Sequence, residues 1–208
     1  KPSAAIIIDE IHLCGIGGIA TTFDLQQVDV LRGPQGTRFG ASALAGMVYA
    51  QSAAPSKQLG INAQGLLGSD GQTGIGAALG GSLTDNLQGR ISAQRFNADG
   101  FRDNLYLSRD DTNSRDELSL RGKLAWQFAG DWELALSTLY ADFHNGYDAW
   151  AIDNGNNTYS DNPGDDAQKT SAASVKLTGS IAPAVDFVSI TSYAASDIVF
   201  SYDADWGN

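Results

Sequence analysis

The sequence predicts a mostly β protein, in which part of an antiparallel transmembrane β-barrel of about seven strands follows a smaller α+β segment. Three observations predict this fold. Residues 57–208 alternate apolar and polar side chains in stretches of about ten residues, the length of a tilted membrane-spanning strand. Short and long connections alternate between these stretches, and aromatic residues gather near their ends.

Residues 1–56 differ from the rest of the chain and are predicted to be a separate domain from residues 57–208. An aliphatic strand is expected at Ala5–Ile8 and another at Val28–Leu31, with a glycine-rich turn near Gly15. Single helical turns are expected at residues 23–27 and 42–44. The Ala-Ala-Pro-Ser run at residues 53–56 is typical of a linker.

Period-two alternation defines the strands of the second domain. In Leu118–Phe128, one face holds leucine, glycine, tryptophan and phenylalanine, and the other holds serine, arginine, lysine, alanine and glutamine. Val185–Asp197 alternates less cleanly, since Val188 and Ile190 lie opposite Phe187 and Tyr193. The predicted strands are Leu59–Gly68, Thr73–Leu83, Leu87–Asn97, Leu118–Phe128, Trp132–Asp142, Ala172–Ile181 and Val185–Asp197.

Connection lengths separate the two ends of the predicted sheet. Residues 84–86, 129–131 and 182–184 are tight turns, whereas residues 98–117 and 143–171 are long and polar. Between antiparallel neighbours, this order places all tight turns at one end and all long loops at the other. Outer-membrane barrels have short periplasmic turns and long external loops, so residues 69–72, 98–117 and 143–171 are expected to be external.

Aromatic positions agree with this orientation. Trp126, Phe128 and Trp132 flank one tight turn, while Tyr140 and Phe143 lie near the opposite end. The strand from Trp132 to Phe143 has eleven residue steps of about 3.3 Å, which span roughly 36 Å. If the strand is tilted by about 40°, this length corresponds to roughly 28 Å along the membrane normal. This height is close to that of the lipid-facing apolar band of a barrel, which is about 25 Å tall and has a girdle of aromatic residues at each edge. Aromatic packing within a soluble sheet is the alternative explanation.

Composition excludes several classes of function. With 13 Lys and Arg against 24 Asp and Glu, the net charge is −11, which argues against nucleic-acid binding and against a polybasic membrane-surface binder. The single cysteine, Cys14, excludes an internal disulfide and a cysteine-cluster zinc site. The longest aliphatic run, Ile6–Ile8, is too short for a transmembrane helix.

Residues 23–49 read FDLQQVDVLRGPQGTRFGASALAGMVY. This stretch resembles the end of the plug domain of TonB-dependent outer-membrane receptors, and Ile6–Ile11 (IIIDEI) resembles a plug strand of the same family. Glu10 stands where the family has glycine, which leaves the geometry of that turn open, and Arg38 replaces the usual leucine. The resemblance implies that residues 1–56 are the C-terminal part of a plug and that residues 57–208 are the first barrel strands.

The plug motif is expected to be structural and to touch the barrel wall. Pro34 fixes a tight turn between two glycines, and two further glycines allow a close approach to the wall. Arg32 is expected to pair with a barrel carboxylate, with a solvated surface arginine as the alternative. The predicted motif residues are Arg32, Gly33, Pro34, Gln35, Gly36, Gly40 and Gly46.

The resemblance implies an outer-membrane receptor of a Gram-negative bacterium, for uptake of a scarce solute energised by a TonB-type complex. It also implies that the protein is not an enzyme and needs no catalytic group or cofactor. A ferric siderophore is the favoured solute, with cobalamin and oligosaccharides as others. The chain is expected to be a fragment, since an open lipid-facing sheet leaves its edges unpaired. Solute contacts are expected in the loops, among them Asp99, Arg102, Tyr106, Tyr147 and Trp150. The alternative is a secreted or surface-anchored all-β adhesion or carbohydrate-binding module.

Three other patterns carry little weight. The G-x-G-x-x-A pattern at residues 15–20 lacks the long helix and the later acidic residue of a dinucleotide site. The Asp153-Asn-Gly-Asn-Asn-Thr stretch fails the EF-hand spacing. Weak calcium binding among Asp153, Asp161, Asp165 and Asp166 stays an alternative to a solvated loop. Glycoside hydrolysis needs two carboxylates held at a defined distance on either side of the glycosidic bond. Adjacent residues such as Asp110 and Asp111 do not provide this arrangement.

Overall fold

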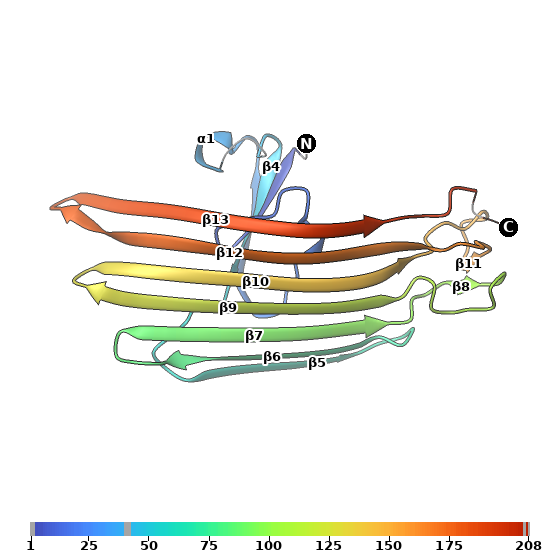
Figure 1. Cartoon of the computed structure of the whole chain (residues 1–208), viewed down its shortest axis with the longest axis horizontal. Coiled ribbons are helices and arrows are strands. Elements are labelled where there is room, and N and C mark those ends of the chain that lie inside the picture. The colour runs from blue at the N-terminus through green and yellow to red at the C-terminus, as the bar shows by residue number, and fades with distance from the viewer. Residues whose placement is uncertain (1–2, 40–42, 206, 208) are drawn as a thin grey trace.

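The computed structural model describes residues 3–39, 43–205 and 207, with the side chains of residues 38 and 39 left aside. A seven-stranded antiparallel sheet carries a four-stranded N-terminal sheet on one face, and two short strands join loops at one end (Figure 1). No helix among these residues is long and apolar enough to cross a membrane.

The large sheet runs in the order β13-β12-β10-β9-β7-β6-β5, so each strand pairs with its neighbours along the chain. Residues 61, 79, 91, 122 and 138 lie in one cross-strand row, which shows the regular register. The predicted antiparallel meander is therefore confirmed. Its strands are β5 (Gly60–Leu67), β6 (Thr73–Ser82), β7 (Leu87–Ala98), β9 (Arg115–Ala129), β10 (Trp132–Tyr147), β12 (Gly164–Ala182) and β13 (Val185–Phe200).

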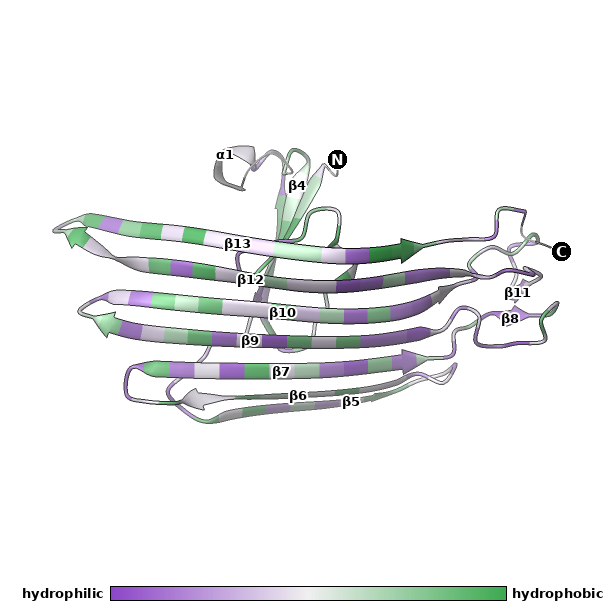
Figure 2. Ribbon diagram, in the orientation of Figure 1, coloured by the Kyte–Doolittle hydropathy of each residue, from purple (hydrophilic) through white to green (hydrophobic). Residues whose placement is uncertain are grey.

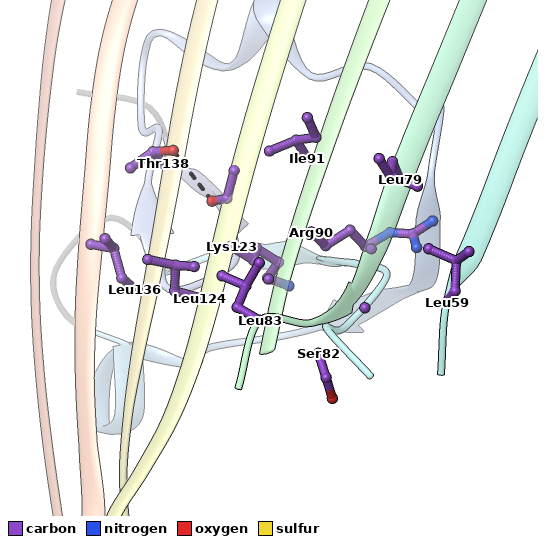
Figure 3. A pocket seen from close by; sticks show the side chains of 14 residues that line it. Leu59, Leu79, Ser82, Leu83, Arg90, Ile91, Lys123, Leu124, Leu136 and Thr138 are labelled. Carbon is purple, nitrogen blue, oxygen red and sulfur yellow. Dashed lines mark hydrogen bonds between the residues drawn. The ribbon is translucent and has the colours of Figure 1, made fainter. Parts of the chain in front are cut away.

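The two faces of this sheet differ as the alternation predicts (Figure 2). The inner face contacts the N-terminal sheet through side chains such as Arg90 and Ser174. The outer face leaves large apolar side chains exposed, among them Ile61, Ile75, Leu79, Ile91 and Trp126. On it, Leu79, Ile91 and Leu124 line an apolar pocket (Figure 3). Among the described residues no second sheet covers this face, whereas a β-sandwich buries such a face against another sheet.

Three strands extend into the two long loops that the sequence predicts. β9 begins at Arg115, β10 ends at Tyr147 and β12 begins at Gly164, so the external loops contract to residues 99–114 and 148–163. The added residues are mostly polar on both faces, which hid them from a search for apolar alternation. The two long loops nevertheless lie at one end of the sheet, together with the short β5–β6 turn, and the tight turns at residues 84–86, 129–131 and 182–184 lie at the other end (Figure 1).

The N-terminal unit, β1–β4 with their connections, packs its sheet in the order β2-β1-β4-β3. β1 (Ala4–Ile8) and β4 (Gly46–Ser52) are parallel, β2 is Ile11–His12, and β3 (Leu25–Arg32) is an edge strand. The helical turn expected at residues 23–27 is wrong, because Leu25–Gln27 pair with the end of β4. The turn expected at 42–44 begins outside the described residues, and residues 43 and 44 are not helical; helix α1 is Gly36–Phe39.

A hydrophobic core forms where the N-terminal unit meets the middle of β10 and β12. From the unit come Ile8, Ile11, Leu13 and Ile19; from the sheet come Leu139, Ala141, Phe143 and Ala172. The inner face is thus polar only in part, because the unit covers this patch and keeps it dry. Val188 and Ile190 on β13 also lie on the inner side, opposite Thr178 and Lys176, where both are exposed.

The glycine-rich segment at residues 15–20 forms only the three-residue 3-10 helix η1 (Gly17–Ile19). A dinucleotide site needs a long helix at this point to hold the pyrophosphate, so its absence here removes that interpretation. Gly17 instead lets the chain pass against the Ile6 side chain.

Candidate functional site

Three ion pairs join the N-terminal unit to the inner face of the sheet. Asp24 pairs with Arg90 at 2.5 Å, Asp9 with Lys123 at 2.7 Å, and Glu10 with Lys176 at 3.1 Å. In each pair the unit supplies the carboxylate and the sheet supplies the cation. The expected contact of Arg32 has the opposite polarity, with the cation on the N-terminal unit. None of the three carboxylates is among the predicted motif or solute-contact residues.

Asp24 forms the most enclosed of these pairs. Its carboxylate accepts bonds from Arg90 Nε at 2.8 Å and Nη2 at 2.5 Å, and from Asn62 Nδ2 at 3.3 Å. Burial by itself would raise the pKa of Asp24, but the bonds from Arg90 and Asn62 outweigh it and hold the pKa below the ordinary 3.8. Asp24 is therefore a fixed anion at neutral pH.

Asp9 joins three elements. Its carboxylate accepts bonds from Ser52 N at 3.0 Å, Ser52 Oγ at 2.5 Å and Lys123 Nζ at 2.7 Å. Lys123 also donates to the Ser52 carbonyl at 3.0 Å, and Ser174 donates to the Asp9 carbonyl at 2.7 Å. The β1–β2 turn, the end of β4 and two barrel-type strands are thereby held at one point.

Glu10 adopts a left-handed conformation, with φ of 68°, so the turn keeps the geometry that a glycine would favour. Interactions of the side chain offset the cost of this backbone conformation. The Glu10 carboxylate accepts hydrogen bonds from Lys176 Nζ at 3.1 Å and from Tyr49 Oη at 3.0 Å. Burial and the neighbouring Glu10 carboxylate raise the pKa of Tyr49 to about 12. The phenol therefore stays protonated and donating at physiological pH.

Arg121 contacts the unit without a carboxylate partner. Its buried guanidinium donates to the Phe23 carbonyl, and to Thr21 Oγ1 at 3.3 Å. The Phe23 ring lies against β6 at Gly76, where a Cβ atom would come within 2.8 Å of it. Glycine at this position therefore permits the close approach of an aromatic side chain to the strand.

A polar cavity of about 240 Å³ lies between the N-terminal unit and the sheet. Asp9, Glu10 and Tyr49 line it from the unit, and Lys123, Glu133 and Lys176 line it from the sheet. Glu133 and Thr178 lie close to the tight turns, so the cavity occupies the end of the sheet opposite the long loops. Hydrogen-bonding groups of both signs make it a space suited to water or a polar solute.

The predicted motif at residues 32–46 forms a turn at the edge of the N-terminal sheet. Gly33 N donates to the Ala45 carbonyl at 3.1 Å and Gln35 N to the Ala43 carbonyl at 2.8 Å. Pro34 lies in this turn, Gly36 begins helix α1, and Gly40 lies outside the described residues. Arg32 is exposed and makes no hydrogen bond to the described strands of the sheet. Contact with a barrel wall stays a prediction for this motif.

Gly46 is the described motif residue at which both the backbone conformation and a close neighbour require glycine, whereas Gly33 has a positive φ of 86° but open space around it. The φ of Gly46 is 152°, and a Cβ atom there would lie 2.6 Å from the Leu31 carbonyl oxygen. We expect Gly46→Ala to lower the free energy of unfolding of the N-terminal unit by about 2 kcal/mol. Gly36→Ala is the matched control, since nothing lies within 4 Å of its Cβ position. Hydrogen exchange of β3 and β4 amides measures both; equal exchange in the two variants would contradict the prediction.

The two long external loops are tied together by a buried carboxylate. Asp148 Oδ2 accepts bonds from Asn104 Nδ2 at 2.9 Å, Thr112 Oγ1 at 2.8 Å and Thr158 Oγ1 at 2.6 Å. The short strands β8 (Asp103–Asn104) and β11 (Asn157–Thr158) pair beside it in parallel. Loops 99–114 and 148–163 therefore form one connected body at this end of the sheet.

We expect Asp148→Ala to loosen both loops together, because three buried donors lose their shared acceptor at a cost of about 1–3 kcal/mol each when unsatisfied. Limited proteolysis and exchange of the β8 and β11 amides measure the effect. Asp161→Ala, on an exposed loop position, serves as the control. If only loop 148–163 becomes sensitive, Asp148 does not connect the two loops.

The residues expected to contact a solute are spread over this end rather than gathered in one place. Asp99 N bonds to the Asp70 carbonyl, Arg102 Nη1 to the Gly155 carbonyl, and the Tyr147 ring packs on Phe200 at 4.8 Å. Tyr106 and Trp150 are exposed. Within the described ranges, no group of three or more His, Cys, Asp or Glu side chains is placed to hold a metal ion, the loop aspartates included.

The chain was compared with known proteins by sequence and by structure. No family model matches the chain. The vitamin B12 transporter BtuB of Vibrio vulnificus (strain YJ016) is 26% identical over 137 residues, which cover 62% of this chain and 22% of that protein. The ferric yersiniabactin uptake receptor FyuA of Yersinia pestis matches in structure over 97% of this chain and 33% of its own, with 19% identity and a TM-score of 0.85.

The ferric-catecholate import receptor Fiu of E. coli K12 also matches, over 96% of this chain and 33% of its own, with 20% identity and a TM-score of 0.72. The chain thus spans about a third of the length of these solved structures and has their fold across nearly all of its residues.

Proposed function

Because the chain has the fold of the plug and first barrel strands of a TonB-dependent outer-membrane receptor, we propose that the complete receptor takes up a scarce solute through the outer membrane of a Gram-negative bacterium. The N-terminal unit is the plug, and the seven-stranded sheet is part of the barrel wall that surrounds it. The observation that supports the proposal is the contact of the N-terminal unit with the inner face of the sheet through three ion pairs among the described residues, while the apolar outer face stays exposed.

The favoured solute is a ferric siderophore. FyuA and Fiu, which match over nearly the whole chain, are a ferric yersiniabactin uptake receptor and a ferric-catecholate import receptor. Cobalamin is the competing solute, since BtuB is a vitamin B12 transporter. The two connected loops around Asp148, residues 99–114 and 148–163, form the surface that the solute would contact first. Membrane lipid and a TonB-type complex are the proposed partners of the receptor.

Uptake by cells tests this proposal. A receptor-deficient strain that carries the complete receptor is expected to accumulate radioactive iron supplied as a ferric siderophore, and to lose this uptake when its TonB protein is deleted. Labelled cyanocobalamin is supplied in parallel. Uptake of cobalamin alone would overturn the siderophore assignment. A receptor that stays in aqueous buffer without detergent would favour the adhesion module and overturn the membrane placement.

A further inference from the structure

The dipeptide Asn-Gly occurs twice near the loop end of the sheet, at residues 145–146 and 154–155. In this dipeptide the backbone nitrogen of glycine can attack the side-chain amide carbon of asparagine, because glycine has no Cβ atom to hinder the approach. The reaction requires a free asparagine side chain, a peptide that can rotate and a base for the proton on the glycine nitrogen. The two dipeptides differ in all three respects.

Asn145 and Gly146 are fixed within β10, which pairs there with β12. The Asn145 side chain makes two hydrogen bonds: its Oδ1 accepts from Asp116 N at 3.1 Å, and its Nδ2 donates to Glu117 Oε1 at 3.1 Å. Gly146 N donates to the Ser114 carbonyl at 2.9 Å, and a peptide carbonyl is too weak a base to take up this proton. Strand pairing and side-chain bonding therefore protect this dipeptide.

Asn154 and Gly155 lie in a bend of loop 148–163, outside the strands, where the peptide between them can rotate more freely. The Asn154 side chain is exposed and has no hydrogen-bond partner among the described residues. Gly155 N donates to Asp153 Oδ1 at 2.8 Å, so a carboxylate lies within the distance at which a general base accepts a proton. This dipeptide therefore has the free side chain and the base that the first one lacks.

We propose that Asn154 is a site of spontaneous deamidation, at which Asp153 is the base. The Gly155 nitrogen forms a bond to Asn154 Cγ as its proton passes to the Asp153 carboxylate. The side-chain amide nitrogen of Asn154 takes up that proton and leaves as ammonia, and a cyclic succinimide remains. Water then opens the ring at one of its two carbonyls and yields aspartate or isoaspartate. The inference concerns the loop itself and rests on neither the solute nor the membrane placement.

Deamidation changes the contact between the two long loops. Aspartate adds a negative charge beside Asp153, whereas isoaspartate also inserts the side-chain methylene group into the main chain. The Gly155 carbonyl accepts a hydrogen bond from Arg102 Nη1 at 3.0 Å, and the Asn156 carbonyl accepts one from Asp103 N at 3.2 Å. A longer main chain at residue 154 displaces both acceptors and loosens the adjoining β8–β11 pair.

Peptide-mapping mass spectrometry of the complete receptor, kept in detergent at mildly alkaline pH, tests this site. The native receptor is expected to lose the Asn154 amide at least about tenfold faster than the Asn145 amide, since strand pairing holds the second dipeptide away from the reacting geometry. In receptor unfolded by urea, both should react at similar rates, because neither dipeptide is then protected. Asp153→Ala should slow the reaction about tenfold or more, whereas Asp161→Ala, at another exposed loop aspartate, should leave it unchanged.

Hydrogen exchange of the β8 and β11 amides measures the effect on the loops. Exchange should become faster as the native receptor ages and should stay slow in Asn154→Asp, which adds the charge without lengthening the main chain. Equal exchange in the aged receptor and in Asn154→Asp would contradict this effect.

Two results would overturn the site: equal loss of amide from both dipeptides in the native receptor, or reaction at Asn154 only after unfolding. An unchanged or faster rate in Asp153→Ala would overturn the role of Asp153 as the base. No solute takes part in these measurements, so their failure and a failure of the uptake experiment remain distinguishable.

Discussion

Asp24→Asn is expected to lower the free energy of unfolding of the plug by about 3 kcal/mol, because it leaves the Arg90 guanidinium without its anion in a closed interface. The exposed fractions of the two side chains are 13% for Arg90 and 3% for Asp24. Asparagine preserves both the size of the side chain and tolerance of the left-handed backbone at this residue, where φ is 55°. Urea unfolding of the plug within the complete receptor, followed by hydrogen exchange of β3 and β4, measures the loss.

Arg95→Gln provides the matched control on the same strand. Arg95 points to the outer side and pairs with Asp116, and the exposed fractions of these side chains are 47% and 41%. An exposed pair of this kind contributes about 0–1 kcal/mol. If Asp24→Asn and Arg95→Gln destabilise the plug equally, the Asp24–Arg90 pair does not anchor it.

The same pair predicts how plug stability depends on pH. The pKa of Asp24 is lower in the folded protein than the ordinary 3.8. A depressed carboxyl pKa means that its stabilisation is complete above 3.8 and is lost as the pH falls through the folded value. We therefore expect the native plug to loosen below about pH 4. Asp24→Asn should reduce this dependence, and an unchanged pH profile would contradict the assignment.

Lys123→Met is expected to destabilise the plug by about 2–3 kcal/mol, and a second substitution is expected to reverse part of the loss. Removal of the lysine leaves the buried Asp9 carboxylate without a cation, although its two bonds from Ser52 remain. The double variant Lys123→Met/Asp9→Asn leaves no buried charge at this point. It should therefore be more stable than Lys123→Met alone by about 1 kcal/mol or more.

Lys169→Met is the control for this series. Lys169 lies on the outer side of β12, 58% exposed and 3.7 Å from Asp142, where loss of the cation is expected to cost less than about 1 kcal/mol. Chemical denaturation of the complete receptor separates the four proteins. A double variant that is less stable than Lys123→Met would show that the Asp9 charge itself, rather than its pairing, holds the turn.

The sequence determines the sheet to a large extent because alternation constrains each strand to one register. The polar faces read from the sequence include Arg90, Arg121, Lys123 and Lys176, and all four contact the N-terminal unit in the structure. Their partners were not predictable, since Asp9 and Lys123 are 114 residues apart. A useful signal was present in the three plug carboxylates, two of them in the β1–β2 turn, opposite a set of inner-face cations.

The inner apolar patch was missed for a different reason. Alternation assigns the apolar face of each strand to lipid, but Leu139, Ala141 and Phe143 point inward and become buried only because the plug covers them. The position at which the N-terminal unit packs decides which inner residues become buried. The sequence of a single strand does not indicate that position. The extended polar ends of β9, β10 and β12 escaped detection because both of their faces are hydrophilic.

The N-terminal unit, the proposed plug, is attached to the sheet by two kinds of contact that respond to different physical conditions. The apolar cluster around Leu13 and Phe143 loses strength on cooling, whereas ion pairs are screened by dissolved electrolyte. Among the three pairs, the Lys176–Glu10 contact has the most exposed cation, so added electrolyte acts there first, beside the polar cavity. High ionic strength should therefore loosen the side of the plug nearest the periplasm, and low temperature should loosen its middle.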